Sequence, residues 1–199
     1  MTPEGLRIGI FGGAFDPVHL GHKKIADSFL GSNIIDKLLI LPTPASPHKE
    51  SESQTEFSHR HEMLKLAFRK YDRIDVSDLE SHLPTPSYTL RTIEHLQEKN
   101  PLDTFFLCIG EDSLASFHTW WHYRDILSKV PLVVANRPGV DCSGISRDIL
   151  ERAIFVEHDQ VDVSSTEIRK KARTGDGTLK ALVPEAVAMY ILKHNLYSD

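Results

Sequence analysis

Short apolar runs alternate along this chain with longer segments in which apolar residues recur every three or four positions. A run of four to six apolar residues bounded by glycine, proline or charged residues is typical of a buried β-strand. A stripe with helical spacing is typical of an amphipathic helix that packs one face on a core. The runs predict strands over residues 8–11, 37–41, 73–77, 104–109, 132–135 and 153–156.

The segments between these runs have the periodicity of helices. In the clearest case, Phe57, Leu64 and Phe68 share one face of a helix predicted over residues 56–71. The other predicted helices cover residues 20–30, 88–98, 148–152, 165–174 and 184–194, with a helical stretch through Leu114 and Phe117 and another that ends near Leu127.

Capping residues mark several of these helix ends. Ser87 and Ser164 precede helical segments and are predicted to be N-caps. Gly175 follows one helix as a C-terminal stop, and Pro184 is expected in the first turn of the last helix.

Strands alternate with helices throughout, which predicts an α/β fold: a Rossmann-like, doubly wound, mostly parallel sheet with helices on both faces. The length of 199 residues fits one domain, residues 1–199, with a C-terminal helical portion (about 164–199) packed on it. Ligands of such sheets bind beyond the carboxyl ends of the strands. Because polar motifs follow the first, second, fourth and sixth predicted strands, we expect one pocket to collect them.

Composition excludes several classes of function. The net charge is −5, so no general basic field attracts nucleic acid. The sequence contains no run of 18 apolar residues, so no membrane span is predicted, and no secretory signal is visible. Cys108 and Cys142 are far apart and form no disulfide framework. The sequence therefore predicts a cytoplasmic protein without nucleic-acid or membrane partners.

The segment from Gly9 to Lys24 carries the densest chemistry. A strand ends at Gly12 and Gly13, a loop follows, and His19 and His22 stand at the start of a helix. Glycines let a backbone approach a phosphate closely, and the first N–H groups of a helix attract anions. A nucleotide phosphate is the expected ligand. Merely exposed histidines are the alternative, and a zinc site is disfavoured because structural zinc needs four ligands.

A second motif spans Val163 to Arg169. Ser164 and Glu167 have the spacing of a capping box, which explains the motif structurally. Arg169 lies one turn into the predicted helix, on the same face as Ser165. These side chains and the free N–H groups of the helix could hold a triphosphate.

Both motifs resemble those of a known superfamily. His19-x-Gly21-His22, after Gly12-Gly13-x-Phe15-Asp16, resembles the HxGH signature of the nucleotidyltransferases. The segment Val163–Arg169 resembles their ISSTxIR motif, which lies against the β- and γ-phosphates of ATP. The resemblance implies transfer of a nucleotidyl group from a nucleoside triphosphate with release of pyrophosphate.

Further segments resemble the bacterial-type nicotinate mononucleotide adenylyltransferases. They are Pro42–Lys49, Pro86–Thr89 and Gly110–Trp120, and the resemblance extends from about Arg7 to Arg173. The sequence departs from that family's pattern at Leu83, Arg91 and Glu111. The implied reaction joins the adenylyl group of ATP to nicotinate mononucleotide and forms nicotinate adenine dinucleotide and pyrophosphate.

The resemblance also implies roles for individual residues. Catalytic roles fall to His19, His22, Lys49 and Arg169. ATP binding falls to Gly12, Gly13, Phe15, His19, His22, Gly110, Asp112, Ser164, Ser165 and Arg169. Mononucleotide binding falls to Asp16, His48, Lys49, Tyr88, Thr89, Trp120 and Trp121. Mg²⁺ is expected to be held by ATP and water, with no ligand from a protein side chain.

Some alternatives stay open on the sequence. Trp121 could replace Trp120 in stacking on the pyridine ring, and Asp112 could simply cap a helix. Nicotinamide mononucleotide could be preferred, or the protein could be a nucleotide sensor without catalysis. A phosphopantetheine adenylyltransferase or a cytidylyltransferase shares HxGH, but the further segments speak against both. A homo-oligomer is left open, and the loop from Thr43 to Thr55 is a candidate lid.

Overall fold

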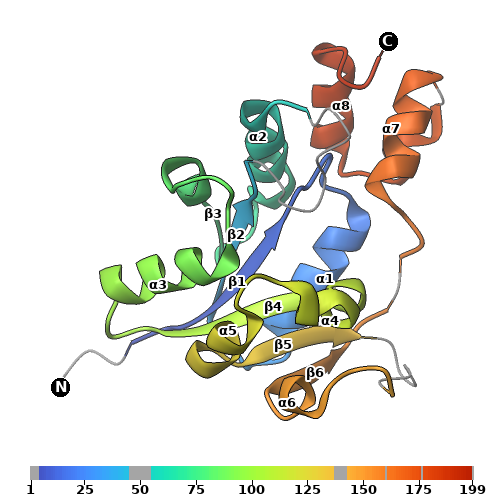
Figure 1. Cartoon of the computed structure of the whole chain (residues 1–199). Helices are drawn as coiled ribbons and strands as arrows, with labels where there is room; N and C mark the ends of the chain where they lie inside the picture. Colours follow the sequence, from blue (N-terminus) through green and yellow to red (C-terminus); the bar gives the residue numbers. More distant parts are fainter. Residues whose placement is uncertain (1–4, 45–54, 137–142, 160, 176, 199) are drawn as a thin grey trace.

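A computed structural model describes residues 5–44, 55–136, 143–159, 161–175 and 177–198, and its centre is a parallel β-sheet (Figure 1). The strand order is β3-β2-β1-β4-β5-β6, and each neighbouring pair is parallel. The strands are β1 (Arg7–Gly13), β2 (Lys37–Pro42), β3 (Ile74–Val76), β4 (Thr104–Gly110), β5 (Leu132–Asn136) and β6 (Ala153–Glu157). The order reverses between β1 and β4, which opens a crevice at their carboxyl ends.

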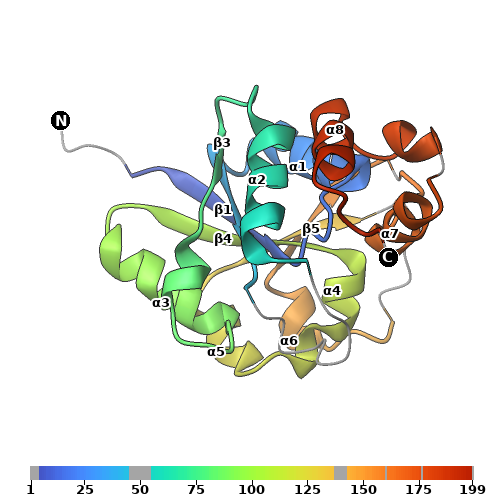
Figure 2. The same cartoon turned by 90° about the horizontal axis from the view of Figure 1, so that it is seen from above.

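Helices cover both faces of the sheet, as Figure 2 shows from above. One face carries α1 (Leu20–Gly31), α2 (Phe57–Phe68), α7 (Ser165–Arg173) and α8 (Glu185–Lys193). The other face carries α3 (Thr89–Lys99), α4 (Glu111–Ser116), α5 (Tyr123–Lys129) and α6 (Arg147–Leu150). Short 3₁₀ turns lie at Leu79–His82, Phe117–Thr119 and Gly177–Ala181. The predicted doubly wound α/β fold is confirmed.

Two hydrophobic clusters lie on opposite faces of the sheet because successive strand residues point in opposite directions. In β2, Leu38 and Ile40 join the cluster under α1 and α2, while Leu41 joins the cluster under α3 and α5. The C-terminal helices add Ile168 and Val187 to the first cluster. Within the described ranges, no helix has the length and apolar character needed to span a bilayer.

Two of the predicted helix-end residues have other positions in the structure. Helix α3 begins at Thr89 with Tyr88 at its N-cap, so Ser87 is not the cap. The Ser87 hydroxyl is buried without a hydrogen-bond partner among the described residues. Pro184 occupies the N-cap of α8 rather than its first turn. Gly175, with φ +66°, follows α7 as predicted, since glycine adopts this left-handed conformation without strain.

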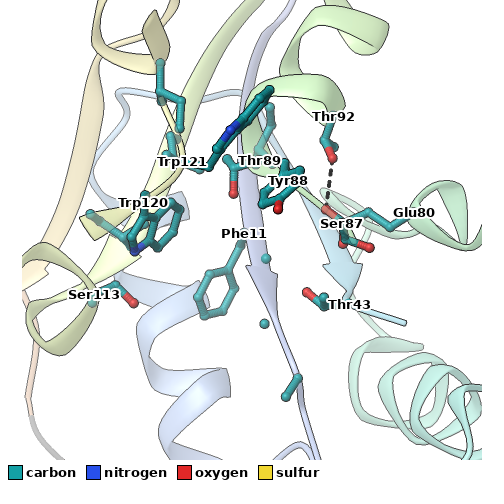
Figure 3. Close-up of a pocket in the computed structure, with 18 residues that line it drawn as sticks. Phe11, Thr43, Glu80, Ser87, Tyr88, Thr89, Thr92, Ser113, Trp120 and Trp121 are labelled. Atoms are coloured by element: carbon teal, nitrogen blue, oxygen red, sulfur yellow. Dashed lines mark hydrogen bonds between the residues drawn. The ribbon is translucent and has the colours of Figure 1, made fainter. Parts of the chain in front are cut away.

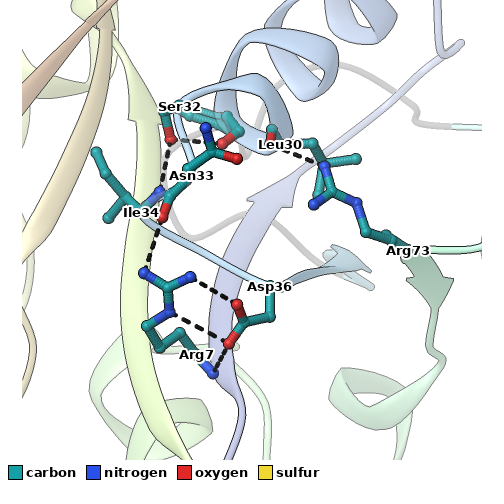
Figure 4. Close-up of polar contacts among 8 residues, drawn as sticks. Arg7, Leu30, Ser32, Asn33, Ile34, Asp36 and Arg73 are labelled. Atoms are coloured by element: carbon teal, nitrogen blue, oxygen red, sulfur yellow. Dashed lines mark hydrogen bonds and ion pairs between the residues drawn. The ribbon is translucent and has the colours of Figure 1, made fainter.

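A salt bridge between Arg7 and Asp36 lies at the amino-terminal ends of β1 and β2 (Figure 4). The Arg7 guanidinium donates to Asp36 Oδ1 at 2.6 Å and to Oδ2 at 3.2 Å, and it also reaches the Asn33 carbonyl at 2.8 Å. The backbone N–H of Arg7 donates to Asp36 Oδ2 at 2.8 Å. Arg73 donates to the Leu30 carbonyl nearby. These bonds hold the turn between α1 and β2 against the start of β1.

The Arg7–Asp36 pair makes stability depend on pH. Hydrogen bonds from Arg7 lower the pKa of Asp36 from 3.8 to about 2. Since the pKa is lower in the folded protein, the pair stabilises the fold above pH 3.8, and this stabilisation is lost as the pH falls towards 2. We expect Asp36→Asn to lower the urea midpoint of unfolding at pH 7. The difference in urea midpoint between this variant and the wild type should shrink as the pH falls from 3.8 towards 2.

Asp75→Asn is the matched control, because its exposed carboxylate lies 3.6 Å from Lys37 in a single contact. A difference between Asp36→Asn and wild type that is the same at pH 7 and pH 2 would contradict the prediction.

Candidate active site

A pocket of about 200 Å³ lies at the carboxyl ends of β1 and β4, where the strand order reverses (Figure 3). Its floor is backbone, from Gly12 and Gly13 at the end of β1 and Gly110 at the end of β4. The pocket brings together these predicted site residues: Gly12, Gly13, Tyr88, Thr89, Gly110, Trp120 and Trp121.

Aromatic side chains form one wall of the pocket. Trp121 stacks on Tyr88 with ring centroids 4.6 Å apart, and Trp120 packs against Phe117 at 5.1 Å. The Arg91 guanidinium lies 5.2 Å from the Tyr88 ring and 5.4 Å from the Trp121 ring. A cation over two π-faces stabilises their arrangement. The wall therefore offers flat surfaces on which a heteroaromatic ring can stack.

The facing wall is polar, and Thr43, Glu80, Ser87 and Thr92, which line it, are not among the predicted site residues. Glu80 is 6% exposed, and its Oε1 accepts a hydrogen bond from the Thr92 hydroxyl at 3.0 Å. Burial raises the pKa of Glu80, while the nearby hydroxyls of Thr92 and Thr43 act in the opposite direction. Glu80 Oε2 and Ser87 Oγ are buried without a hydrogen-bond partner among the described residues. Both residues line the pocket and contribute to its polar wall.

The two histidines of the HxGH motif cap helix α1 reciprocally. The backbone N–H of His22 donates to His19 Nδ1 at 3.4 Å, and the backbone N–H of His19 donates to His22 Nδ1 at 3.3 Å. Their rings stack with centroids 3.7 Å apart. A nitrogen that accepts a hydrogen bond carries no proton, so each neutral ring carries its proton on Nε2. Each histidine therefore presents an Nε2–H donor.

Electrostatics keep this pair uncharged. Burial lowers the pKa of His19 to about 4. Burial, together with the neighbouring His19, lowers the pKa of His22 well below its ordinary value of 6.5. Near pH 7 both imidazoles are neutral, so they act on a phosphate as hydrogen-bond donors and not as cations.

The loop before α1 is shaped to hold these rings. A Cβ on Gly21 would lie 3.0 Å from His19 Nδ1 and 3.2 Å from Val163 Cγ1, so a larger residue there would crowd the His19 ring. Phe15 has φ +48°, a conformation that costs a non-glycine residue about 1–2 kcal/mol. Its buried ring meets His22 edge-on at 4.9 Å. The Phe15 ring thus packs inside the protein, and the residue can meet a ligand only through its backbone.

Helix α7 docks on the same loop. Ser164 Oγ accepts from the Glu167 backbone N–H at 3.2 Å, which confirms the predicted N-cap. Ser165 Oγ donates to the Pro17 carbonyl at 3.0 Å, and Arg169 Nη1 donates to the Asp16 carbonyl at 2.9 Å. The structure therefore places the second predicted phosphate motif against the first.

The Asp16 side chain is buried and engaged inside the protein. Its Oδ1 accepts from the Tyr197 hydroxyl at 2.8 Å, and its Oδ2 accepts from the Thr55 backbone N–H at 3.3 Å. The carboxylate, 6% exposed as a residue, thereby connects the first loop to the C-terminal segment.

Arg60 is a structural residue that the sequence reasoning missed. It is 1% exposed and donates to carbonyls at the ends of β1 and β2 and before α2. Its acceptors are Ala14 (2.7 Å), Thr55 (2.8 Å), Thr43 (2.9 Å) and Pro44 (3.3 Å). The sequence does indicate its burial, because Arg60 has helical spacing with Met63, Leu64 and Ala67. It therefore lies on the apolar face of α2.

The first pocket is not lined by every predicted site residue, since His19, His22, Ser165, Arg169 and Asp112 do not line it. Asp112 is exposed in the first turn of α4 and lines a second cavity of about 360 Å³ with Asn136 and Phe155. Its neighbour Ser113 lines the first pocket, because successive residues of a helix point about 100° apart. His48, Lys49 and most of the predicted lid lie outside the described residues.

The fold and the pocket define an α/β nucleotide-binding protein. Comparison agrees, since residues 10–171 match the cytidylyltransferase-like family. The probable nicotinate-nucleotide adenylyltransferase of Clostridium tetani is 37% identical over 196 residues, covering 94% of this chain and 97% of that protein. The enzyme of the same name from Thermotoga sp. (strain RQ2) is 40% identical over 187 residues, covering 92% and 93%.

A solved structure has the same fold. The Plasmodium falciparum nicotinic acid mononucleotide adenylyltransferase complexed with NaAD superposes with a TM-score of 0.80 at 24% identity, over 96% of this chain and 97% of that one. The chain belongs to the nicotinate-nucleotide adenylyltransferases within the cytidylyltransferase-like family.

The histidine geometry predicts a tautomer and a titration. We expect ¹⁵N chemical shifts to show both rings neutral and protonated on Nε2 at pH 7, with His19 gaining a proton only near pH 4. Because the unfolded chain binds protons more readily than the folded one, stability should fall as the pH drops from 6.5 towards 4. An imidazolium signal from either ring at pH 6.5 would contradict the assignment.

Proposed function

We propose that this protein transfers the adenylyl group of ATP to the 5′-phosphate of nicotinate mononucleotide, forming nicotinate adenine dinucleotide and pyrophosphate in NAD biosynthesis. The observation that carries the proposal is the pair of neutral, stacked imidazoles beside a pocket with a glycine floor and an aromatic wall. The names of the relatives at 37% and 40% identity support the same reaction.

The chemistry requires positioning more than proton transfer. A phosphate oxygen of the mononucleotide is already ionised at neutral pH, so it attacks the α-phosphorus without a general base. The bond from that phosphorus to the bridging oxygen breaks, and pyrophosphate leaves with its electron pair. The Nε2–H groups of His19 and His22 donate hydrogen bonds to phosphate oxygens as charge develops on them.

We assign the leaving group to the second motif. Ser165 and Arg169, with the N–H groups that begin at the Ser164 cap, bind pyrophosphate in this proposal. Lys49 lies outside the described residues, and its role here stays a prediction from the sequence. The hydrogen bond from Arg169 to the Asp16 carbonyl places α7 at the loop that carries the histidines.

We assign the mononucleotide to the first pocket. Trp120 or Trp121 stacks on the pyridine ring, and Tyr88 and the backbone near Thr89 lie beside it. Asp16 acts as a positioning residue, because both of its carboxylate oxygens accept hydrogen bonds within the protein. The role of His48 stays a prediction from the sequence.

We assign the ATP nucleoside to the second cavity, beside Gly110. Asp112 lines this cavity, and its carboxylate can accept hydrogen bonds from a ribose diol. The backbone of Gly12, Gly13 and Phe15 approaches the phosphates between the two cavities.

Mg²⁺ fits this site as a companion of ATP. Among the described residues, no group of three or more histidine, cysteine, aspartate or glutamate side chains could hold a metal ion. Mg²⁺ keeps several waters and binds triphosphate oxygens, so it would neutralise phosphate charge without a protein cage. The cytoplasmic location and a homo-oligomer stay predictions.

Pyrophosphate release tests the proposed reaction. Reactions contain ATP and Mg²⁺ with nicotinate mononucleotide, nicotinamide mononucleotide or phosphopantetheine as acceptor. We expect turnover with nicotinate mononucleotide because its ring and phosphate match the two ends of the pocket. Turnover with phosphopantetheine alone would overturn the acceptor, turnover with the amide alone would reverse the ring preference, and no turnover with any of them would favour a sensor.

Replacement of His22 tests the donor role. We expect His22→Ala to lower kcat by about 10²–10³, the loss typical of one preorganised donor. The missing cap should cost about 1 kcal/mol, so thermal melting will show a folded protein. His95→Ala, on α3 and outside the site, is the control. Full turnover by His22→Ala would remove this residue from the reaction.

A further inference from the structure

Two residues that line the first pocket each have a buried side-chain oxygen without a hydrogen-bond partner among the described residues. Glu80 Oε2 and Ser87 Oγ are the pocket-lining side-chain atoms that are buried without a hydrogen bond among the described residues. Buried polar groups in native proteins are rarely unpaired, so two of them on residues that line one pocket need an explanation. Glu80 is 6% exposed, and its Oε1 accepts from the Thr92 hydroxyl at 3.0 Å. Thr92 therefore fixes the orientation of the Glu80 carboxyl group.

The polar wall lies between the two ends of the pocket. Figure 3 shows Glu80, Ser87 and Thr43 together, across the pocket from Trp120. Thr43 donates its backbone N–H to the Gly13 carbonyl at 2.9 Å, which places this wall beside the glycine floor. Ser87 directly precedes Tyr88 of the aromatic wall. In a mononucleotide, the group between the phosphate and the ring is the ribose.

The buried carboxyl group of Glu80 also favours contact with the ribose over contact with the phosphate or the ring carboxylate. The phosphate and the ring carboxylate of nicotinate mononucleotide are anions, and a buried carboxylate repels both. The ribose hydroxyls are neutral, and each donates and accepts a hydrogen bond. They can satisfy Glu80 Oε2 whether or not the carboxyl group holds a proton, and they can equally satisfy the Ser87 hydroxyl.

Resting on the proposed function, we propose that Glu80 and Ser87 bind the ribose hydroxyls of the mononucleotide and make this enzyme select a ribonucleotide as adenylyl acceptor. Thr92 is a positioning residue in this arrangement, because it acts through the Glu80 carboxyl group.

Kinetics with modified acceptors test the proposal. Initial rates are measured with nicotinate mononucleotide and its 2′-deoxy and 3′-deoxy analogues, at saturating ATP and Mg²⁺. In the wild type we expect loss of the bound hydroxyl to raise KM about tenfold, as expected for a hydrogen bond to a buried charged group. Glu80→Gln should raise KM for the ribonucleotide. In this variant the deoxy analogue should have about the same KM as the ribonucleotide, so the deoxy penalty, which is the ratio of these two KM values, falls to about 1. KM for ATP should stay unchanged.

The variant is chosen to keep the fold. Glutamine retains an oxygen that can accept from Thr92, and thermal melting checks that Glu80→Gln is folded. Ser87→Ala carries the same prediction independently, with a smaller loss, should the first variant fail to fold. Glu94→Gln is the matched control, because Glu94 is an exposed α3 residue that pairs with Lys129.

The outcomes distinguish failure of the proposed reaction from failure of the ribose contact alone. A wild type that turns over no pyridine mononucleotide overturns the proposed function and this inference with it. An active wild type whose deoxy penalty is unchanged in Glu80→Gln and Ser87→Ala overturns only the inference. A change confined to the ratio between nicotinate and nicotinamide mononucleotides would place the wall at the ring substituent and also overturn it.

Discussion

The first turn of α1 needs acceptors for its backbone N–H groups, and two imidazole rings supply them. Because each ring accepts at Nδ1, the two stacked, neutral rings carry their protons on Nε2. Gly21 leaves room for the His19 ring, and Phe15 packs edge-on against His22. The interactions that begin this helix are therefore the same ones that fix two Nε2–H donors.

The loop that carries these rings is held from three directions. Arg60 links the ends of β1 and β2 through carbonyl acceptors, and the Asp16 carboxylate offsets part of the cost of burying its charge. Arg169 attaches α7 to the loop through the Asp16 carbonyl. Tyr197 attaches the C-terminal segment through the Asp16 side chain. A loop becomes rigid when distant segments share its hydrogen bonds.

The strand order reverses between β1 and β4, and the helices on opposite faces leave a crevice beyond the carboxyl ends of these strands. The first pocket lies there, and Ser113 of α4 lines it. Asp112, the preceding residue, lines the second cavity. Adjacent residues of α4 thus line separate cavities, which is consistent with the proposed reaction between two nucleotides.

The sequence by itself determined the order of strands and helices, the Ser164 cap, the Gly175 stop and the HxGH histidines, because these features depend on neighbours a few residues away. Tertiary structure alone decided which distant groups pair. Tyr197 reaches Asp16 across 181 positions of sequence, which no local pattern encodes. Packing also buried Ser87 beside Glu80 instead of leaving it to cap α3. The free energy of these contacts depends on burial and on partners that only the folded chain brings together.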